Sequence, residues 1–147
     1  MNAAVIERRL RRFLLIVVAL SCIATFIELI LEKHTKELLQ FVPFALCVAG
    51  FLSVVAVLAR PQPLTINILR AVMALVILGS LLGGWEHLES NVDFETEMRP
   101  GITAIDAIPA ALMGAAPLLA PGILGLAGVL ALAATYYHPA LGKRSDG

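Results

Sequence analysis

Four long apolar segments run along the chain, and short polar stretches separate them. The apolar runs predict helices over about residues 10–32, 38–59, 65–85 and 118–137. A helix needs about 20 predominantly apolar residues to cross the hydrocarbon core of a bilayer, and each run is close to that length. The pattern therefore predicts an all-α, polytopic membrane protein with four transmembrane helices in one small bundle.

Prolines complicate the segment that precedes the fourth apolar run. Pro109, Pro117 and Pro121 each lack a backbone donor and disfavour a continuous helix before them. We expect a break near Pro117 to Pro121, with a short interfacial helix within residues 103–117. A re-entrant segment, or a single bent helix from Ala107 onward, is the alternative interpretation.

Composition agrees with a membrane protein of one domain, residues 1–147. Hydrophobic residues make up 59% of the chain, charged residues make up 15%, and the mean hydropathy is +0.88. A soluble domain of this size contains far more charge. The formal net charge is zero, so nothing in the composition favours nucleic acid as a partner.

Basic residues are concentrated in alternate polar segments. Eight of the eleven lie before the first helix, between the second and third, or after the fourth: Arg8, Arg9, Arg11, Arg12, Arg60, Arg70, Lys143 and Arg144. Cytoplasmic loops are enriched in Lys and Arg. Both termini are therefore expected on the cytoplasmic side of a bacterial inner membrane. The first apolar run is longer than a signal-peptide core and no A-x-A site follows it, which favours an uncleaved helix.

The orientation places residues 86–117 on the outer side. Trp85 at the outer interface, with Tyr136 and Tyr137 at the inner one, fits the aromatic belts of membrane proteins. Gly79 and Gly83 form a small-xxx-small pair, which allows a neighbouring helix to approach closely.

Glu28 is an ionisable residue within the first apolar run. It shares one helical face with Ser21, Thr25 and Glu32, so this polar stripe is expected to face the interior. Such a residue is by default a functional hypothesis, here a proton or cation ligand. The alternative is that Glu28 lies close enough to the interface to stay hydrated.

The third helix offers a neighbour for Glu28. Ser80, Gly84 and His87 share a face by helical spacing, and the first and third helices run in the same direction. We therefore expect Glu28 to lie near Gly84.

The outer segment is rich in carboxylates, with two histidines nearby. Carboxylates and imidazoles together suit zinc or manganese, although the spacing matches no metal motif, and positive-inside topology alone leaves acids outside. A metal site therefore stays undecided, with these candidate ligands: Glu28, Glu32, His34, Glu86, His87, Glu89 and Asp93.

No cofactor is expected. Haem would need two facing histidines, and His138 is expected on the opposite side from His34 and His87. Soluble-enzyme signatures such as G-x-S-x-G and H-E-x-x-H are absent from the sequence, so no catalytic or cofactor-binding residue is assigned.

The motif W-x-H-x3-N-x2-F-E-x-E runs from Trp85 to Glu97 and is followed by Pro100. With the later A-P-G and Y-x-H-P-A-L segments, it resembles small, uncharacterised four-helix integral-membrane proteins of bacteria. The resemblance covers about the last 65 residues. The resemblance implies no activity, but it implies that residues 85–100 form an ordered structure rather than a flexible loop.

Three functions are consistent with these features. The first is a non-enzymatic accessory, structural or assembly role, in contact with the lipid bilayer and within a homo-oligomer or a larger membrane complex. The second is an oligomeric proton or divalent-cation transporter that uses Glu28 and the acidic outer segment. The third is an outer-face membrane enzyme that uses His87 and nearby carboxylates.

Overall fold

The computed structural model describes residues 2–33 and 38–142, and those residues are almost entirely helical. They form five α-helices and two short 3-10 helices, with no β-strand. The elements are α1 (Ala3–Leu31), η1 (Leu38–Phe41), α2 (Val42–Ala59), α3 (Pro63–Met98), α4 (Ala104–Ala111), α5 (Leu119–Thr135) and η2 (Pro139–Leu141). The prediction of an all-α fold is confirmed.

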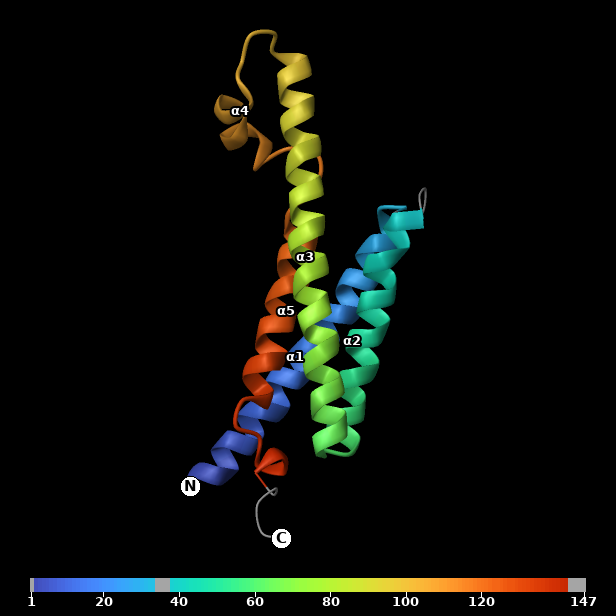
Figure 1. The fold of residues 1–147 in the computed structure, drawn as a ribbon, viewed down its shortest axis with the longest axis vertical. Coiled ribbons are helices and arrows are strands. Elements are labelled where there is room, and N and C mark those ends of the chain that lie inside the picture. The colour runs from blue at the N-terminus through green and yellow to red at the C-terminus, as the bar shows by residue number, and fades with distance from the viewer. Residues whose placement is uncertain (1, 34–37, 143–147) are drawn as a thin grey trace.

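Four of the helices lie side by side along the length of the molecule (Figure 1). α3 packs against α2 and α5, and α1 packs against the same two helices from the other side. α3 extends well past its neighbours, and α4 packs against this extension. α3 therefore packs against α2, α4 and α5.

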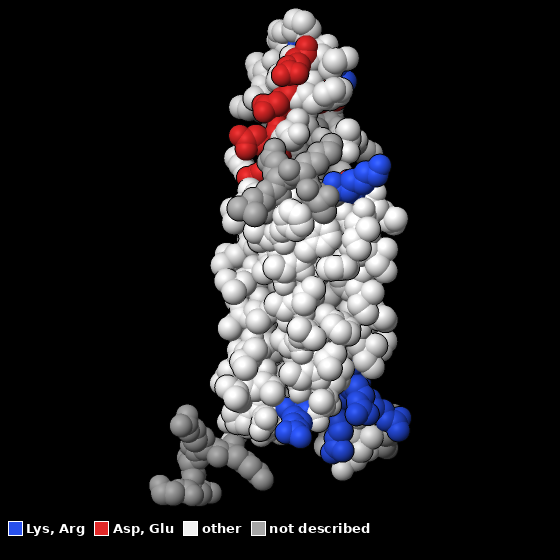
Figure 2. Space-filling model, turned by 90° about the vertical axis from the view of Figure 1, so that its right-hand side faces the viewer, with Lys and Arg blue, Asp and Glu red and all other residues white. Residues whose placement is uncertain are grey.

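Three helices are long and apolar enough to cross a membrane: α1, the segment Leu39–Ala59 that includes α2, and α3. Large apolar side chains point outward along them, and Leu81 and Phe13 are 66% and 60% exposed. On the face drawn in Figure 2, a broad band without charged side chains separates a basic end from an end rich in Asp and Glu. A soluble protein rarely exposes so large an apolar surface, so these features indicate a membrane protein.

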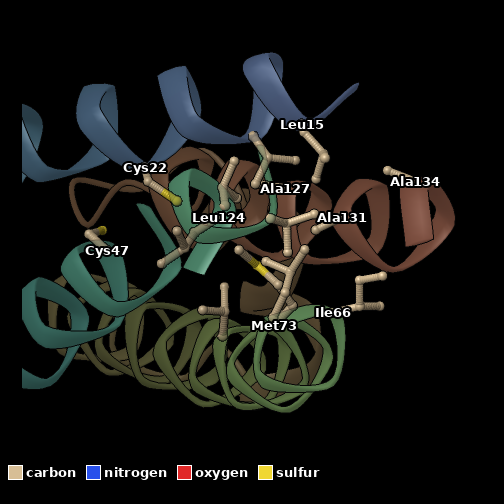
Figure 3. Close-up of a cluster of buried hydrophobic side chains, with 14 of the residues drawn as sticks. Leu15, Cys22, Cys47, Ile66, Met73, Leu124, Ala127, Ala131 and Ala134 are labelled. Atoms are coloured by element: carbon tan, nitrogen blue, oxygen red, sulfur yellow. The ribbon is translucent and has the colours of Figure 1, made fainter. Parts of the chain in front are cut away.

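The buried core lies between α1, α2, α3 and α5 (Figure 3). It combines larger apolar side chains from the first three helices with alanines from α5: Leu15, Val18, Val54, Ile66, Leu69, Met73, Val76, Ala127 and Ala131. At Gly128 of α5, an added Cβ would lie 2.6 Å from Cγ1 of Ile77 in α3. Small residues on α5 therefore let the two backbones approach closely.

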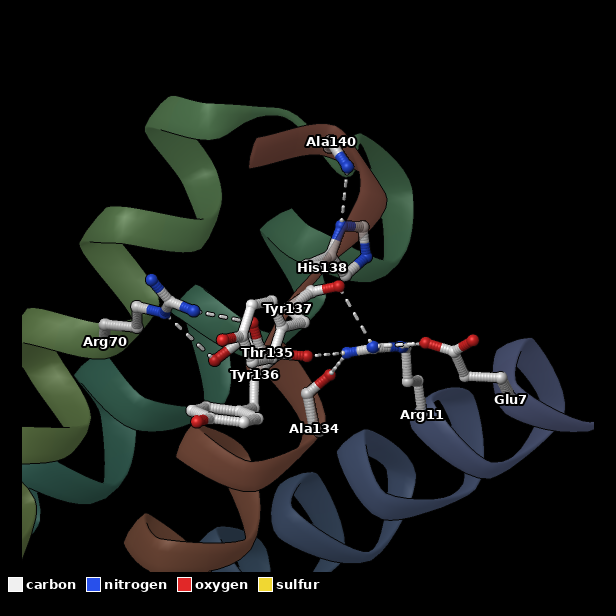
Figure 4. A network of polar contacts seen from close by, with 9 residues as sticks. All are labelled: Glu7, Arg11, Arg70, Ala134, Thr135, Tyr136, Tyr137, His138 and Ala140. Carbon is white, nitrogen blue, oxygen red and sulfur yellow. Dashed lines mark hydrogen bonds and ion pairs between the residues drawn. The ribbon is translucent and has the colours of Figure 1, made fainter. Parts of the chain in front are cut away.

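Two arginines from neighbouring helices hold the C-terminal end of α5 (Figure 4). Nη1 of Arg11 donates to the carbonyl oxygens of Ala134 and Tyr136, both at 2.7 Å. Nη2 of Arg70 donates to the carbonyl oxygen of Thr135 at 2.6 Å. The last carbonyls of a helix lack partners within the helix, and cations there also complement the helix dipole.

His138 follows this cluster and has its pKa lowered. Burial contributes most, and the positive charges of Arg11 and Arg70 add to it. The neutral ring suits the local geometry, because its Nδ1 accepts a hydrogen bond from the Ala140 N–H at 3.2 Å.

The structure corrects two predicted helix boundaries. The first helix was expected to begin near residue 10, but α1 begins at Ala3, because the polar residues before Phe13 include no Gly or Pro and continue the helix beyond the apolar run. The third helix was expected to end near Trp85, but α3 continues from Glu86 to Met98 and ends at the residues before Pro100. Hydropathy falls after Trp85, yet no Gly or Pro interrupts the chain until Pro100. Helix-forming Glu, Leu and Met residues therefore continue the helix outside the apolar region.

The segment before α5 agrees with the predicted break. α4 is a short helix, as expected, and residues 112–118 are not helical. A single bent helix from Ala107 onward is therefore wrong. Pro117 falls in this non-helical stretch, and Pro121 lies in the first turn of α5, where a missing N–H costs little.

Candidate functional site

A crevice of about 500 Å³ opens among the helices near the end of the molecule that carries the acids of α3, here called the acidic end. Its walls come from α1, η1, α2, α3, α5 and the segment that precedes α5. Most of the lining is apolar, and Leu29, Leu46, Leu82, Ala120, Pro121 and Leu124 are representative.

One face of α3 supplies the longest wall of the crevice. Its residues recur every three or four positions, as one helical face requires: Gly79, Ser80, Gly83, Glu86, His87 and Ser90. Gly84 does not line the crevice, and an added Cβ there would meet nothing within 4 Å. The face predicted from Ser80, Gly84 and His87 is therefore completed by Gly83.

The glycines on this wall differ in their surroundings. At Gly79, an added Cβ would lie 2.5 Å from Cδ1 of Leu46, so α2 and α3 touch closely there. At Gly83, an added Cβ would lie 3.8 Å from Cβ of Pro121, which is an ordinary contact. Gly79 thus marks a tight helix contact, whereas Gly83 borders open space.

A second hollow on α3 continues from the crevice toward water. It is lined by Glu86, Glu89, Ser90, Asp93, Phe94 and Glu97, and Glu86 and Ser90 belong to both hollows. We call Glu86, Glu89, Asp93 and Glu97 the acidic stripe, because spacings of three, four and four place them on one helical face. Figure 2 shows Asp and Glu side chains following one another along the projecting end of the molecule.

The Asn91 side chain of α3 fixes the end of α4 and the segment that precedes α5, which lie against α3. The side chain is 3% exposed, and its Nδ2 donates to the carbonyl oxygens of Ala111 and Ala116, both at 2.9 Å. Its Oδ1 accepts from the Ala116 N–H at 2.9 Å. A Cβ at Gly114 would overlap the Asn91 amide, so only glycine fits there. These bonds satisfy the backbone N–H and carbonyl of Ala116 and give the Ala111 carbonyl, which also accepts from the Gly114 N–H, a second donor.

Ser80 of α3 fixes the first turn of α5, closer to the core. Its hydroxyl donates to the carbonyl oxygen of Pro121, and an added Cβ at Gly125 would lie 2.5 Å from the Ser80 Oγ. Two polar side chains of α3 therefore position the segment before α5 and the first turn of α5. The role of Asn91 was not predicted from the sequence. The available signal was a single amide side chain among several carboxylates, followed in the chain by a segment rich in Gly and Pro.

The structure separates most of the candidate metal ligands. Glu28 is half-buried on α1 and does not line the crevice, and Glu32 is exposed at the end of α1. Glu86, Glu89 and Asp93 are exposed on the acidic stripe, and half-buried His87 lines the crevice. His34 lies outside the described residues. Within residues 2–33 and 38–142, no three His, Cys, Asp or Glu side chains are grouped to hold a metal ion.

The polar stripe predicted on α1 faces inward only in part. Thr25 is 3% exposed and lines the crevice, whereas Ser21 and Glu28 are half-buried. The expected proximity of Glu28 and Gly84 stays a prediction.

The aromatic residues predicted as anchors are all exposed. Trp85 is 66% exposed on α3, at the base of its projecting part. Tyr136 and Tyr137 follow α5, are 66% and 81% exposed, and pack edge to face with 4.7 Å between ring centroids. Exposed aromatic side chains at both ends of the uncharged band suit a membrane interface.

The buried part of the crevice lining is mainly apolar. Leu29 and Leu124 line it at 8% and 3% exposure, beside the buried hydroxyl side chains of Thr25 and Ser80. Beyond it toward the basic end, the interior is filled by side chains such as Val18, Ile66 and Met73, each fully buried. The arrangement can hold an apolar group inside and a polar group at the mouth.

No protein-family model matches the chain, and no curated protein or solved structure shows significant similarity to it. The resemblance of the segment from Trp85 onward to small bacterial membrane proteins stays a prediction.

Proposed function

We propose that the protein is a four-span protein of the bacterial inner membrane with a non-enzymatic accessory or assembly role. In this proposal both termini are cytoplasmic, and the four helices α1, α2, α3 and α5 form a small bundle in the membrane. The projecting part of α3 and the attached α4 form a platform on the outer side that receives a partner protein. The length of α3 is the observation that carries the proposal.

α3 is far longer than a bilayer requires. Its 36 residues span about 54 Å at about 1.5 Å per residue, whereas the hydrocarbon core is about 30 Å thick. The exposed apolar surface of α3 gives way to acids directly after Trp85. Residues 86–98 therefore extend roughly 20 Å beyond the interface in this placement.

The other charged groups support the same placement. Arg11 and Arg70 hold the opposite end of α5, close to exposed Tyr136 and Tyr137. The start of α1, with the arginines that precede Phe13, and the α2–α3 connection, with Arg60, are at that end as well (Figure 1), which suits the cytoplasmic face. α5 has 17 residues and spans about 26 Å, so α5 with its flanking residues suits a fourth span.

The platform has one covered face and one open face. α4 covers one face, where Ala107 and Ala111 are fully buried. The other face presents the acidic stripe and Phe94, whose side chain is 52% exposed. Complementary charge fixes the orientation of a complex and speeds its formation, so we propose a partner that presents basic side chains.

Photo-crosslinking tests this function. We expect p-benzoylphenylalanine at Phe94 to form one discrete protein adduct in cells, and the same probe at Leu81 in the apolar band to form none. The variants Glu89→Lys and Asp93→Lys should together reduce the Phe94 adduct about tenfold, because they reverse charges beside the probe. No adduct at Phe94, or an adduct unaffected by charge reversal, would contradict the proposed role.

The transporter and enzyme functions receive less support. A transporter that uses Glu28 needs a route past it, but Glu28 does not line the crevice and the core closes the crevice from the basic end. An enzyme that uses His87 needs partners within hydrogen-bond reach of a substrate. Glu86 and Ser90 lie near His87 at the mouth of the crevice, but most of the remaining lining is apolar.

A further inference from the structure

We propose that the crevice binds an amphiphile with an apolar body and a cationic amine head. This site shares the acidic stripe with the partner-binding face of the platform, but its apolar part lies between the helices, away from Phe94. The apolar body would lie between the helices, and the amine would lie at the mouth, beside Glu86 and the rest of the acidic stripe.

The size and lining of the crevice suit one small amphiphile. Its volume of about 500 Å³ falls within the range of small-molecule sites, about 300–1,000 Å³. Leu29, Leu46 and Leu124 form apolar walls at its inner end. Apolar space within a protein favours an apolar occupant over water, which needs polar partners.

The polar groups of the crevice are distributed unevenly. The Ser80 hydroxyl already donates to the Pro121 carbonyl, so the inner part offers few free polar groups. Glu86, His87 and Ser90 gather at the mouth, where the crevice meets the hollow along the acidic stripe. An occupant with one polar end would therefore place that end outward.

Charge at the mouth selects the type of head group. No Lys or Arg is among the described residues that line either hollow. Among the described residues, no ion pair engages the acidic stripe, whereas Arg99 pairs with Glu95, an acid outside the stripe, at 3.2 Å. Four carboxylates that have no cationic partner among the described residues attract a cation and repel an anionic head group.

A bare metal ion fits this site less well than an organic amine. Among the described residues, no three His, Cys, Asp or Glu side chains are placed so that they could hold one metal ion, and this includes the acidic stripe. A metal ion also leaves the apolar part of the crevice unused, whereas an amphiphile fills it and gains from apolar burial.

The two adjacent glycines of α3 provide matched variants. A leucine at Gly83 would extend into the crevice, and its Cβ would meet only an ordinary contact with Pro121. A leucine at Gly84 would lie outside the crevice, with nothing near its Cβ. The two substitutions change helix propensity equally, so only the filling of the crevice distinguishes them.

Native mass spectrometry of the full-length protein in phosphatidylcholine nanodiscs tests the proposal with three probes of equal chain length. Dodecylamine is cationic near neutral pH, dodecanol is neutral and dodecyl sulfate is anionic. We expect one dodecylamine per chain, bound about tenfold more tightly than either of the others. Gly83→Leu should weaken dodecylamine binding about tenfold, whereas Gly84→Leu should leave it within about twofold.

Further variants keep the test decisive. If Gly83→Leu does not fold, Ser90→Phe narrows the mouth from an exposed position and should cause the same loss. Glu86→Gln combined with Asp93→Asn should remove the preference for dodecylamine over dodecanol. Equal binding of all three probes, or equal effects of the two glycine variants, would overturn the proposal. Gly83→Leu leaves Phe94 and its surroundings unchanged, so the Phe94 adduct tests the proposed function independently.

Discussion

At the scale of single residues, the polar side chains with the most contacts serve backbone groups. Arg11 donates to the carbonyl oxygens of Ala134, Tyr136 and Tyr137, and Glu7 pairs with it from one turn earlier on α1. The planar guanidinium suits this arrangement, because its fixed donors point at several acceptors at once. Arg11 therefore joins α1 to the end of α5, beyond its role as a topology signal.

The first prediction concerns this arginine. We expect Arg11→Ala to lower the free energy of unfolding by about 2 kcal/mol, because charge-assisted bonds to carbonyls near the end of α5 are lost. Arg11→Lys should recover only part of this loss, since one ammonium cannot span three carbonyls. The measurement is thermal unfolding of the purified protein, followed by circular dichroism.

The neighbouring Arg12 gives the control. It is exposed on α1 and carries the same charge at nearly the same position in the sequence. Arg12→Ala should change the free energy of unfolding by less than about 0.5 kcal/mol. Equal losses for Arg11→Ala and Arg12→Ala would show that charge alone matters and that the bonds to α5 do not.

At the scale of elements, α4 and residues 112–118 depend on one buried amide. Asn91 satisfies three backbone groups of this segment, from Ala111 and Ala116. Asn91→Asp keeps the shape of the side chain but removes both amide donors. The Ala116 carbonyl would then lack its donor, and a carboxylate would be buried beside the carbonyl oxygens of Ala111 and Ala116, which is unfavourable.

The second prediction is that Asn91→Asp loosens this segment. We expect amide hydrogen exchange in residues 112–118 to accelerate at least about tenfold, since one lost buried hydrogen bond is worth about 1–3 kcal/mol. Hydrogen-exchange mass spectrometry measures it. Asn67→Asp is the control, because Asn67 is exposed on the same helix. Unchanged exchange in the Asn91 variant would contradict the role of Asn91 in fixing this segment.

The elements also show which features the sequence could predict. The break near Pro117 follows from the chemistry of proline, and the structure contains it. The extension of α3 past Trp85 was missed because low hydropathy ends a membrane span without ending a helix. The absence of Gly and Pro from residues 86–99 was the signal that could have corrected it.

The site was harder to predict than the helices. Helical spacing identifies residues that share a face, and Ser80 and His87 indeed share one. Spacing does not show how closely a second helix approaches that face. Gly83 borders the crevice and Gly84 does not, because Pro121 and its neighbours lie on one side of α3. Such differences arise from packing between segments about 40 residues apart in sequence.

At the scale of the whole molecule, the charged side chains are segregated along the long axis, and α3 projects at one end of the same axis. An uncharged band lies between a basic end and an acidic end, and α3 carries the acids beyond its neighbours (Figures 1 and 2). The proposed platform requires that the acidic end lie in the outer aqueous compartment. This orientation is therefore the central claim.

Cysteine labelling of intact cells tests this claim most directly. The starting variant lacks thiols through Cys22→Ala and Cys47→Ala, and single cysteines then replace Gln62, Leu75 or Asp93. We predict that a membrane-impermeant maleimide labels position 93 in intact cells and position 62 only after permeabilisation, with position 75 protected in both. Labelling of position 62 in intact cells, or protection of position 93 throughout, would contradict the placement of α3 across the membrane with its acidic end outside.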